Sequence, residues 1–126
     1  MIPRVDLKKG NYFYPQNLRD LLRVDVINST GIISMNQTNF PAAPFNFESI
    51  FPVILTPKIL AATPFKFVRH DAFGRWKTYQ HDDLIIHLSE PGFHVNHGNK
   101  FIIYDALHQL QNIYMSVTKK ELPIFF

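Results

Sequence analysis

The fold class is decided by one stretch in the second half of the chain, FKFVRHDAFGRWKTYQHDDLIIHL (residues 65–88). Within it, residues 65–69, 75–79 and 83–88 are rich in aromatic and β-branched side chains, and short polar segments separate them. In the last of these runs, apolar positions alternate with mixed ones, as expected of a strand that buries one face. The stretch therefore predicts three consecutive strands of an antiparallel sheet.

Further strands are predicted on both sides of this stretch, each next to a turn signal rich in glycine, asparagine or proline. Two hairpins are expected. One has its turn at residues 28–31, and the other joins residues 93–96 to residues 101–104. Residues 50–55 have the composition of a short strand that Pro52 confines to the edge of a sheet.

Two helices complete the expected fold. Between residues 105 and 118, Leu107, Leu110 and Tyr114 fall on one apolar stripe at helical spacing. A shorter helix is expected over residues 56–62, where Thr56 can act as the N-cap and a proline takes the first helical position. The prediction is an α+β fold: a small antiparallel β-sheet or SH3-like partial barrel, with one C-terminal amphipathic helix and one short helix.

The composition favours one small cytoplasmic domain. The chain has 126 residues, 46% hydrophobic and 14% aromatic, which suits a single domain over residues 1–126 with a substantial core. There is no cysteine, so a disulfide framework and thiolate metal sites are excluded. No secretory signal and no apolar run long enough to cross a bilayer is visible. We therefore expect a cytoplasmic location and no membrane partner.

The charge distribution bears on the class of partner. The net charge of +3 slightly favours anionic partners, yet the basic residues are scattered along the chain. A nucleic-acid-binding domain of this size usually carries a clustered basic stripe, so nucleic acid is disfavoured. The apolar tail at residues 122–126 needs burial against the core or against a second subunit, which makes a homo-oligomer a further expectation.

Catalytic and cofactor motifs are missing from the sequence. There is no GxSxG motif, no phosphate-binding glycine loop and no cysteine nucleophile. Residues 94–97 form an HxxH, but no acidic or cysteine ligand accompanies it at metal-binding spacing. Residues 70–71, residues 81–83, and His87 with Glu90 are candidate acid–base pairs, but neighbours along a strand point to opposite faces. We predict a non-enzymatic protein with no cofactor and no metal; a histidine-based hydrolase is the least favoured alternative.

Residues 69–79 offer the richest set of groups for a small anionic ligand. Arginine side chains can grip a phosphate in a bidentate fork, and indole and phenol rings can stack on a base. Together with a second group after residue 93, the predicted ligand-binding residues are Arg69, His70, Arg75, Trp76, Lys77, Tyr79, His94, Asn96, His97 and Lys100. The alternative interpretation is a hairpin whose aromatic rings pack inward and whose cations face water.

A second candidate site lies on the C-terminal helix. His108 and Asn112 are one helical turn apart, so their side chains project side by side, and Gln111 lies next to them. Amide side chains can bind the backbone of a partner protein. We therefore predict His108, Gln111 and Asn112 as partner-binding residues. The alternative interpretation is the solvated side of an amphipathic helix.

Three segments resemble one protein family. Residues 103–122, IYDALHQLQNIYMSVTKKEL, are similar to the ending VHQLQNLYFALTGEEL of small uncharacterised proteins encoded by phages, prophages and mobile elements of gut-type bacteria. Residues 7–13 resemble their LRIGNYVY start, and residues 54–60 resemble their IPLTEEWL segment. The chain departs from this pattern at Lys119, where the family has glycine, and in the long loop expected over residues 36–48.

The resemblance implies a phage setting and no particular activity. Combined with the missing catalytic motifs, it favours a non-enzymatic binding protein that sequesters a small anionic, nucleotide-like immune signal of the host. The alternative is an adaptor or inhibitor that binds a host protein through the helix face and exposed aromatic residues. Either protein would act in the cytoplasm of the infected or lysogenic host cell.

Overall fold

The computed structural model describes residues 2–15, 21–29, 31–34, 45–71, 76–82, 84–89, 92–95 and 103–126. Contacts divide the chain into two compact units, and each unit is described by itself. Unit 1 comprises Met1–Val53 and Leu107–Ile113, and unit 2 comprises Ile54–Ala106 and Tyr114–Phe126. A single domain over residues 1–126 stays a prediction.

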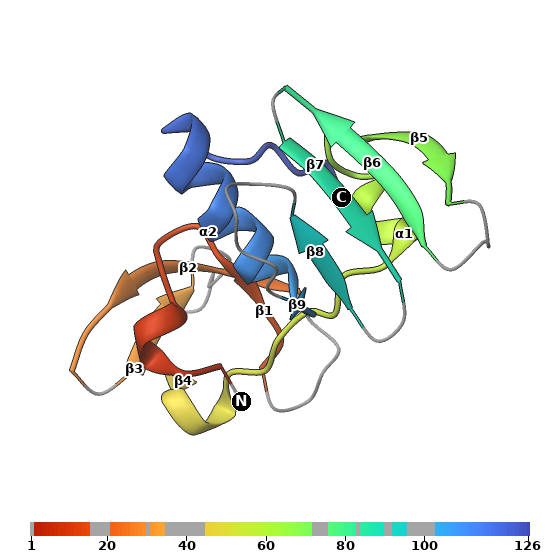
Figure 1. Ribbon diagram of the computed structural model, residues 1–126. Helices are drawn as coiled ribbons and strands as arrows, with labels where there is room; N and C mark the ends of the chain where they lie inside the picture. The colour runs from red at the N-terminus through yellow and green to blue at the C-terminus, as the bar shows by residue number, and fades with distance from the viewer. Residues whose placement is uncertain are drawn as a thin grey trace. The chain divides into compact units, whose positions relative to one another are not determined.

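Unit 1 is built on an antiparallel sheet whose strands are neighbours in chain order: β1 (Tyr12–Phe13), β2 (Leu22–Ile27), β3 (Gly31–Ser34) and β4 (Phe45–Asn46) (Figure 1). The predicted hairpin of β2 and β3 is confirmed. Asn28 N–H donates to the Gly31 carbonyl, and Asn28 Oδ1 accepts from Gly31 N–H, both at 2.9 Å. Glycine is required at position 31, because a Cβ there would lie 2.0 Å from the Phe45 carbonyl oxygen.

The core of unit 1 is a cluster of buried apolar side chains: Ile2, Leu7, Phe13, Val24, Ile32 and Ile50. Phe45 packs its ring edge-on against Phe13, with the ring centroids 5.8 Å apart. The N-terminal segment, which includes the 3-10 helix Arg4–Asp6, is tied to this core because Ile2 N–H donates to the Ile50 carbonyl at 2.9 Å. A second 3-10 helix spans Phe47–Ser49.

Residues 50–55, all of them described, do not form the predicted strand. They contain two isolated bridges, Tyr14 with Phe51 in unit 1 and Ile54 with Ala106 in unit 2. Pro52 has no N–H to donate, so it interrupts the ladder of hydrogen bonds that a strand requires. The prediction of an edge strand here is wrong for that reason.

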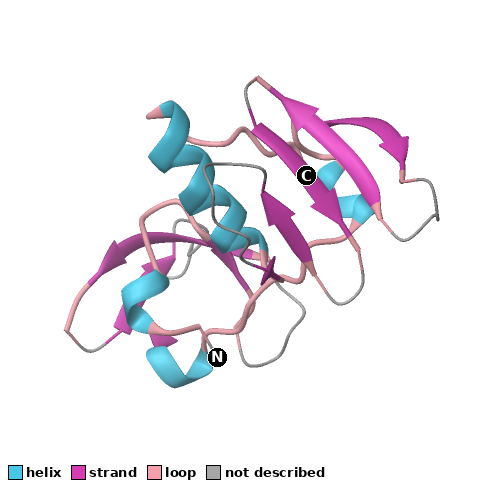
Figure 2. Ribbon diagram, viewed as in Figure 1, coloured by secondary structure: helices cyan, strands magenta, loops and turns pink. Residues whose placement is uncertain are grey.

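Unit 2 is built on a five-stranded antiparallel sheet, again in chain order: β5 (Lys66–His70), β6 (Lys77–His81), β7 (Leu84–Leu88), β8 (Phe93–Val95) and β9 (Ile103–Tyr104) (Figures 1 and 2). The strands predicted over residues 65–88 and the hairpin of β8 and β9 are confirmed. β7 alternates as expected, because Leu84, Ile86 and Leu88 are buried while Ile85 and His87 are half-buried.

Both predicted helices are present (Figure 2). α1 spans Pro57–Leu60, and its predicted N-cap is confirmed because Thr56 Oγ1 accepts from Ile59 N–H at 3.2 Å. α2 spans Leu107–Thr118 and so begins later than residue 105. Its apolar stripe is buried at Leu107 and Leu110 in unit 1 and at Tyr114 in unit 2.

The predicted fold class is confirmed. The protein is α+β, with two antiparallel sheets, one of them curled into a half-barrel, a C-terminal helix and a short helix. In the described part of the chain, no helix combines the length and the apolar character that a membrane span requires.

The C-terminal tail is partly held by unit 2. Leu122 is buried, and Phe125 N–H donates to the Ala62 carbonyl at 2.7 Å. The rings of Phe125 and Phe126 remain exposed. The prediction that the tail packs on the core therefore holds at Leu122, and a homo-oligomer stays a prediction.

Candidate functional site

One face of the unit 2 sheet carries a row of polar and aromatic side chains, which we call the histidine face. It consists of Trp76, directly before β6, and of five residues that antiparallel pairing places side by side, one from each strand: Arg69, Thr78, His87, His94 and Ile103. The neighbouring positions on β7, Ile86 and Leu88, are buried on the other side of the sheet. The histidine face therefore lies opposite to the apolar side of this sheet.

Three aromatic rings meet on this face. His87 and His94 are paired directly across β7 and β8, with ring centroids 4.6 Å apart. The Trp76 ring lies against both of them, with centroid distances of 6.0 Å to His87 and 5.6 Å to His94. Asp71 anchors the Trp76 backbone, because Asp71 Oδ1 accepts from Trp76 N–H at 3.2 Å. The result is one aromatic cluster that also carries hydrogen-bonding nitrogen atoms.

Thr78 orients the imidazole of His87 through a hydrogen bond. Its side chain is buried, and its Oγ1 lies 3.0 Å from His87 Nδ1. A hydroxyl can donate or accept, so this hydrogen bond suits either tautomer of the ring. In both cases Nδ1 is engaged and the ring orientation is set, and Nε2 is the nitrogen that remains for a ligand.

The pKa values of both histidines are lowered. Burial is the larger cause at each ring. The second cause for His87 is the positive charge of Arg69, and the second cause for His94 is the nearby His87. Both imidazoles are therefore held toward the neutral form near neutral pH, while Arg69 keeps its charge. The histidine face thus combines a permanent cation, two neutral imidazoles and an indole.

The structure brings together three of the predicted ligand-binding residues, namely Arg69, Trp76 and His94. His70, Lys77 and Tyr79 lie in rows that continue into Leu88 and Ile86, which belong to the buried side of the sheet. Four other predicted residues fall outside the described residues: Arg75, Asn96, His97 and Lys100.

Sequence reasoning missed Thr78 and His87 as members of the site. A signal was present, because the alternation along β7 separates His87 from the buried Leu84, Ile86 and Leu88. The antiparallel register then adds Thr78, which pairs with His87. No signal in the sequence alone specifies that register.

Two of the residues predicted on the polar side of α2, His108 and Gln111, are buried. Within unit 1, Gln111 is 5% exposed, its Nε2 donates to the Gly10 carbonyl at 2.8 Å, and its Oε1 accepts from Tyr12 N–H at 2.9 Å. His108 is 3% exposed. The prediction of an open partner-binding surface is corrected at these two residues, because both side chains lie in the interior.

Asn112 takes part in the same network. Its Nδ2 donates to the Asp6 carbonyl at 2.7 Å, and its Oδ1 accepts from Asn11 Nδ2 at 2.9 Å. The N-terminal segment of unit 1 is irregular between its 3-10 helix and β1, so its backbone groups need partners outside a ladder. The amides of α2 supply those partners, which is the physical reason for the correction.

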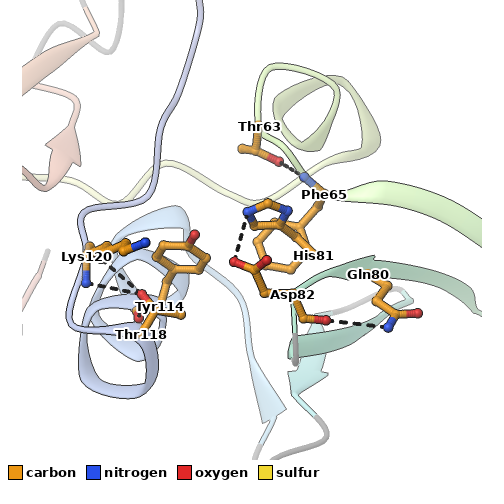
Figure 3. Close-up of polar contacts among 8 residues, drawn as sticks. All are labelled: Thr63, Phe65, Gln80, His81, Asp82, Tyr114, Thr118 and Lys120. Carbon is orange, nitrogen blue, oxygen red and sulfur yellow. Dashed lines mark hydrogen bonds and ion pairs between the residues drawn. The ribbon is translucent and has the colours of Figure 1, made fainter.

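A second polar cluster in unit 2 joins the β6–β7 turn to Tyr114 of α2 (Figure 3). His81 Nε2 lies 3.4 Å from Asp82 Oδ2, and the His81 ring is stacked on Tyr114 with centroids 5.8 Å apart. Phe65 packs edge-on against both rings. The expectation that neighbouring residues point apart is wrong here, because Asp82 adopts a φ of 52° in the turn and redirects the chain.

This second cluster has the character of a structural clamp. The pKa of Tyr114 is raised, first by burial and then by the negative charge of Asp82. The phenol therefore stays protonated and can donate to the Asp82 carboxylate, while Thr118 Oγ1 donates to the Tyr114 carbonyl at 2.8 Å. Figure 3 shows the His81, Asp82 and Tyr114 side chains directed toward one another. We interpret the role of this cluster as structural: its contacts hold the β6–β7 turn against Tyr114.

Neither cluster forms a metal centre from described residues, since no three histidine, aspartate or glutamate side chains among them are placed to hold an ion. His97 of the HxxH motif lies outside the described residues. Comparison of the chain with protein-family models, curated proteins and solved structures gives no match. The case for a function therefore depends on the histidine face.

Proposed function

We propose that the histidine face binds a small anionic ligand with a planar ring, of the nucleotide class. The observation that carries this proposal is the convergence of Arg69, His87, His94 and Trp76 on one side of the unit 2 sheet. A guanidinium suits phosphate because its fork of N–H groups matches two phosphate oxygens. Imidazole nitrogens add further hydrogen bonds, and an indole provides a surface on which a base can stack.

A purely structural role explains this face less well. Apolar cross-strand pairs at the central positions of β7 and β8 would stabilise the sheet without desolvating any polar group. The chain instead places His87 and His94 in contact there, half-buried and beside the charge of Arg69. Burial of polar rings beside a positive charge lowers the stability of the fold. Residues that lower stability in this way are typical of binding sites.

The phage setting implied by the resemblance narrows the biological role. A host immune signal of the nucleotide class has the required charge and ring, and a protein that binds it without chemical conversion would sequester it. The alternative role as an adaptor for a host protein relied on exposed aromatic residues and on the helix face at His108, Gln111 and Asn112. Two of these side chains are buried and two make hydrogen bonds inside unit 1, so ligand binding is preferred.

The single tryptophan of the chain makes a direct test practicable. Trp76 lies in the proposed site, so its fluorescence should change and saturate when nucleotides such as adenosine monophosphate and cyclic AMP are added. Arg69→Gln should weaken binding by about tenfold or more, since a hydrogen bond to a charged group contributes about 1.5–3 kcal/mol. Lys58→Gln removes an exposed cation from α1, outside the histidine face, and should bind like the parent protein.

Mass spectrometry of material released on denaturation gives a second, independent test. Freshly purified protein that releases a stoichiometric nucleotide-like compound would support sequestration and identify the ligand. The proposal is refuted if no compound is released and no nucleotide alters Trp76 fluorescence. Equal weakening by Arg69→Gln and Lys58→Gln would also count against the histidine face, because it would indicate a nonspecific charge effect.

A further inference from the structure

We propose that anion binding on the histidine face is coupled to the uptake of one proton by the His87–His94 pair. This inference rests on the proposed function and adds its regulation, because the ligand would be held more tightly as pH falls and released as pH rises. Three features carry it: the contact between the two imidazoles, the charges around them, and the hydrogen bond that orients His87.

The contact between the rings sets the number of protons. His87 and His94 lie directly opposite each other, with centroids 4.6 Å apart. Two imidazolium charges at that separation repel each other, so the second protonation is much less favourable than the first. The two rings therefore titrate as one unit, which takes up one proton before repulsion opposes the second.

The cations around the pair oppose protonation while the site is empty. Arg69 of β5 acts on His87 through its charge. Lys66 of β5 lies in the next row of the same face, through its pairing with Gln80 and the pairing of Gln80 with Ile85. Thr78 and Gln80 of β6 and Trp76 directly before it, which lie on this face, are uncharged.

The carboxylate of Asp71 does not compensate for the charge of Arg69. Asp71 follows β5, and its Oδ1 accepts from Trp76 N–H at 3.2 Å, so it is directed at the backbone. The pKa of His87 is lowered in spite of it. On β8 and β9 the pair is flanked by no described charge, since the row ends at Ile103. The empty site therefore favours two neutral imidazoles.

A bound phosphate group would reverse this balance. Its negative charge favours imidazolium over imidazole, and a proton taken from solvent completes a charge-assisted hydrogen bond from an imidazole N–H to a phosphate oxygen. Thr78 Oγ1, 3.0 Å from His87 Nδ1, keeps that ring in position. Nε2 of His87 is then the nitrogen whose N–H donates to the phosphate oxygen.

Calorimetry in buffers of different ionisation enthalpy counts the protons taken up. The probes are cyclic AMP and sulfate, because neither anion titrates near neutral pH and any uptake therefore belongs to the protein. We expect close to one proton per bound probe just below neutral pH, and about tenfold tighter binding at about pH 6 than at about pH 8. The double variant H87Q/H94Q should remove most of the uptake, because either ring alone can still take up the proton. His81→Gln, outside the histidine face, should leave it unchanged.

Nuclear magnetic resonance of the histidine rings tests the coupling without any variant. The pKa of the His87–His94 pair should rise when cyclic AMP is added to the parent protein. Binding of the probes with no proton uptake and no such rise would overturn the coupling and leave the proposed function standing. If neither probe binds, the coupling and the proposed function both fail.

Discussion

Thr78 Oγ1 and His87 Nδ1 lie 3.0 Å apart on adjacent strands, and Thr78 is only 4% exposed. A hydroxyl buried in a sheet needs a hydrogen-bonding partner, and this one finds it in a ring of the proposed binding site. The same contact therefore provides the buried Thr78 hydroxyl of unit 2 with a hydrogen-bonding partner and orients the His87 ring on the surface. Thr78 is a positioning residue for His87.

Thr78→Val removes the hydroxyl and nearly preserves the shape of the side chain. We expect the free energy of unfolding to fall by about 1 kcal/mol. We also expect weaker binding of cyclic AMP and an altered pKa of His87, because the ring loses its orienting bond. Urea unfolding, Trp76 fluorescence and ring resonances measure the three effects. Thr78→Ser keeps the hydroxyl and should restore the His87 titration; an unchanged titration in Thr78→Val would rule out a positioning role.

The lowered pKa values of His87 and His94 make stability depend on pH. The pKa of histidine in the unfolded chain is about 6.5, and both folded-state values lie below it. Between these values the unfolded chain binds more protons than the folded one. The free energy of unfolding therefore rises with pH through this window, and the stability is lost as pH falls through it. Denaturant unfolding at a series of pH values should show a flatter profile for H87Q/H94Q; an equally steep profile would contradict the assignment.

The members of the site could be predicted better than their arrangement. Arg69, Trp76 and His94 stand out because cationic and aromatic side chains are dense in those parts of the sequence. The partnership of Thr78 with His87 depends on the register between β6 and β7, and the irregularity in β5 between Phe67 and Arg69 brings Arg69 into the same row. These are properties of the folded sheet, so local patterns do not reveal them.

In the fold as well, features that depend on neighbouring residues could be predicted, and features that depend on residues far apart in the sequence could not. β7 could be predicted because its alternation reports directly on a sheet with one buried face. The burial of Gln111 could not, since a polar side chain off the apolar stripe looks solvent-facing on a helix. Its partners at Gly10 and Tyr12 lie about a hundred residues earlier in the chain, beyond the reach of any periodicity.

Gln111→Met should destabilise unit 1. The substitution keeps the approximate volume and removes the side-chain partner of the Gly10 carbonyl and of Tyr12 N–H. We expect the free energy of unfolding to decrease by about 2 kcal/mol, because buried backbone groups lose hydrogen bonds. Ser116→Ala, on the exposed side of α2, is the control and should stay within about 0.5 kcal/mol of the parent protein. Similar urea midpoints for Gln111→Met and the parent protein would show that the amide is dispensable.

Lys119→Gly should stabilise the protein. Lys119 follows the last residue of α2 with a φ of 62°, the left-handed conformation that glycine adopts without steric cost. Relief of that cost, less the extra freedom of glycine in the unfolded chain, should raise the free energy of unfolding by about 0.5–1 kcal/mol.

Lys119→Ala is the matched control for this substitution. It retains a Cβ and removes the hydrogen bond of 3.0 Å from Lys119 Nζ to the Ser116 carbonyl. Thermal unfolding should show no gain for alanine. A gain as large as that of glycine would mean that the lysine side chain, and not the backbone conformation, is responsible.

β5 is an edge strand of the unit 2 sheet, and all of its residues are exposed. Exposed edges invite strands of other molecules and can start intermolecular sheets. In β5 the register is irregular between Phe67 and Arg69, so its N–H and C=O groups do not form an even ladder. Lys66 and Arg69 would also bring like charges together if two copies met along this edge. Both features of β5 disfavour edge-to-edge pairing of two copies.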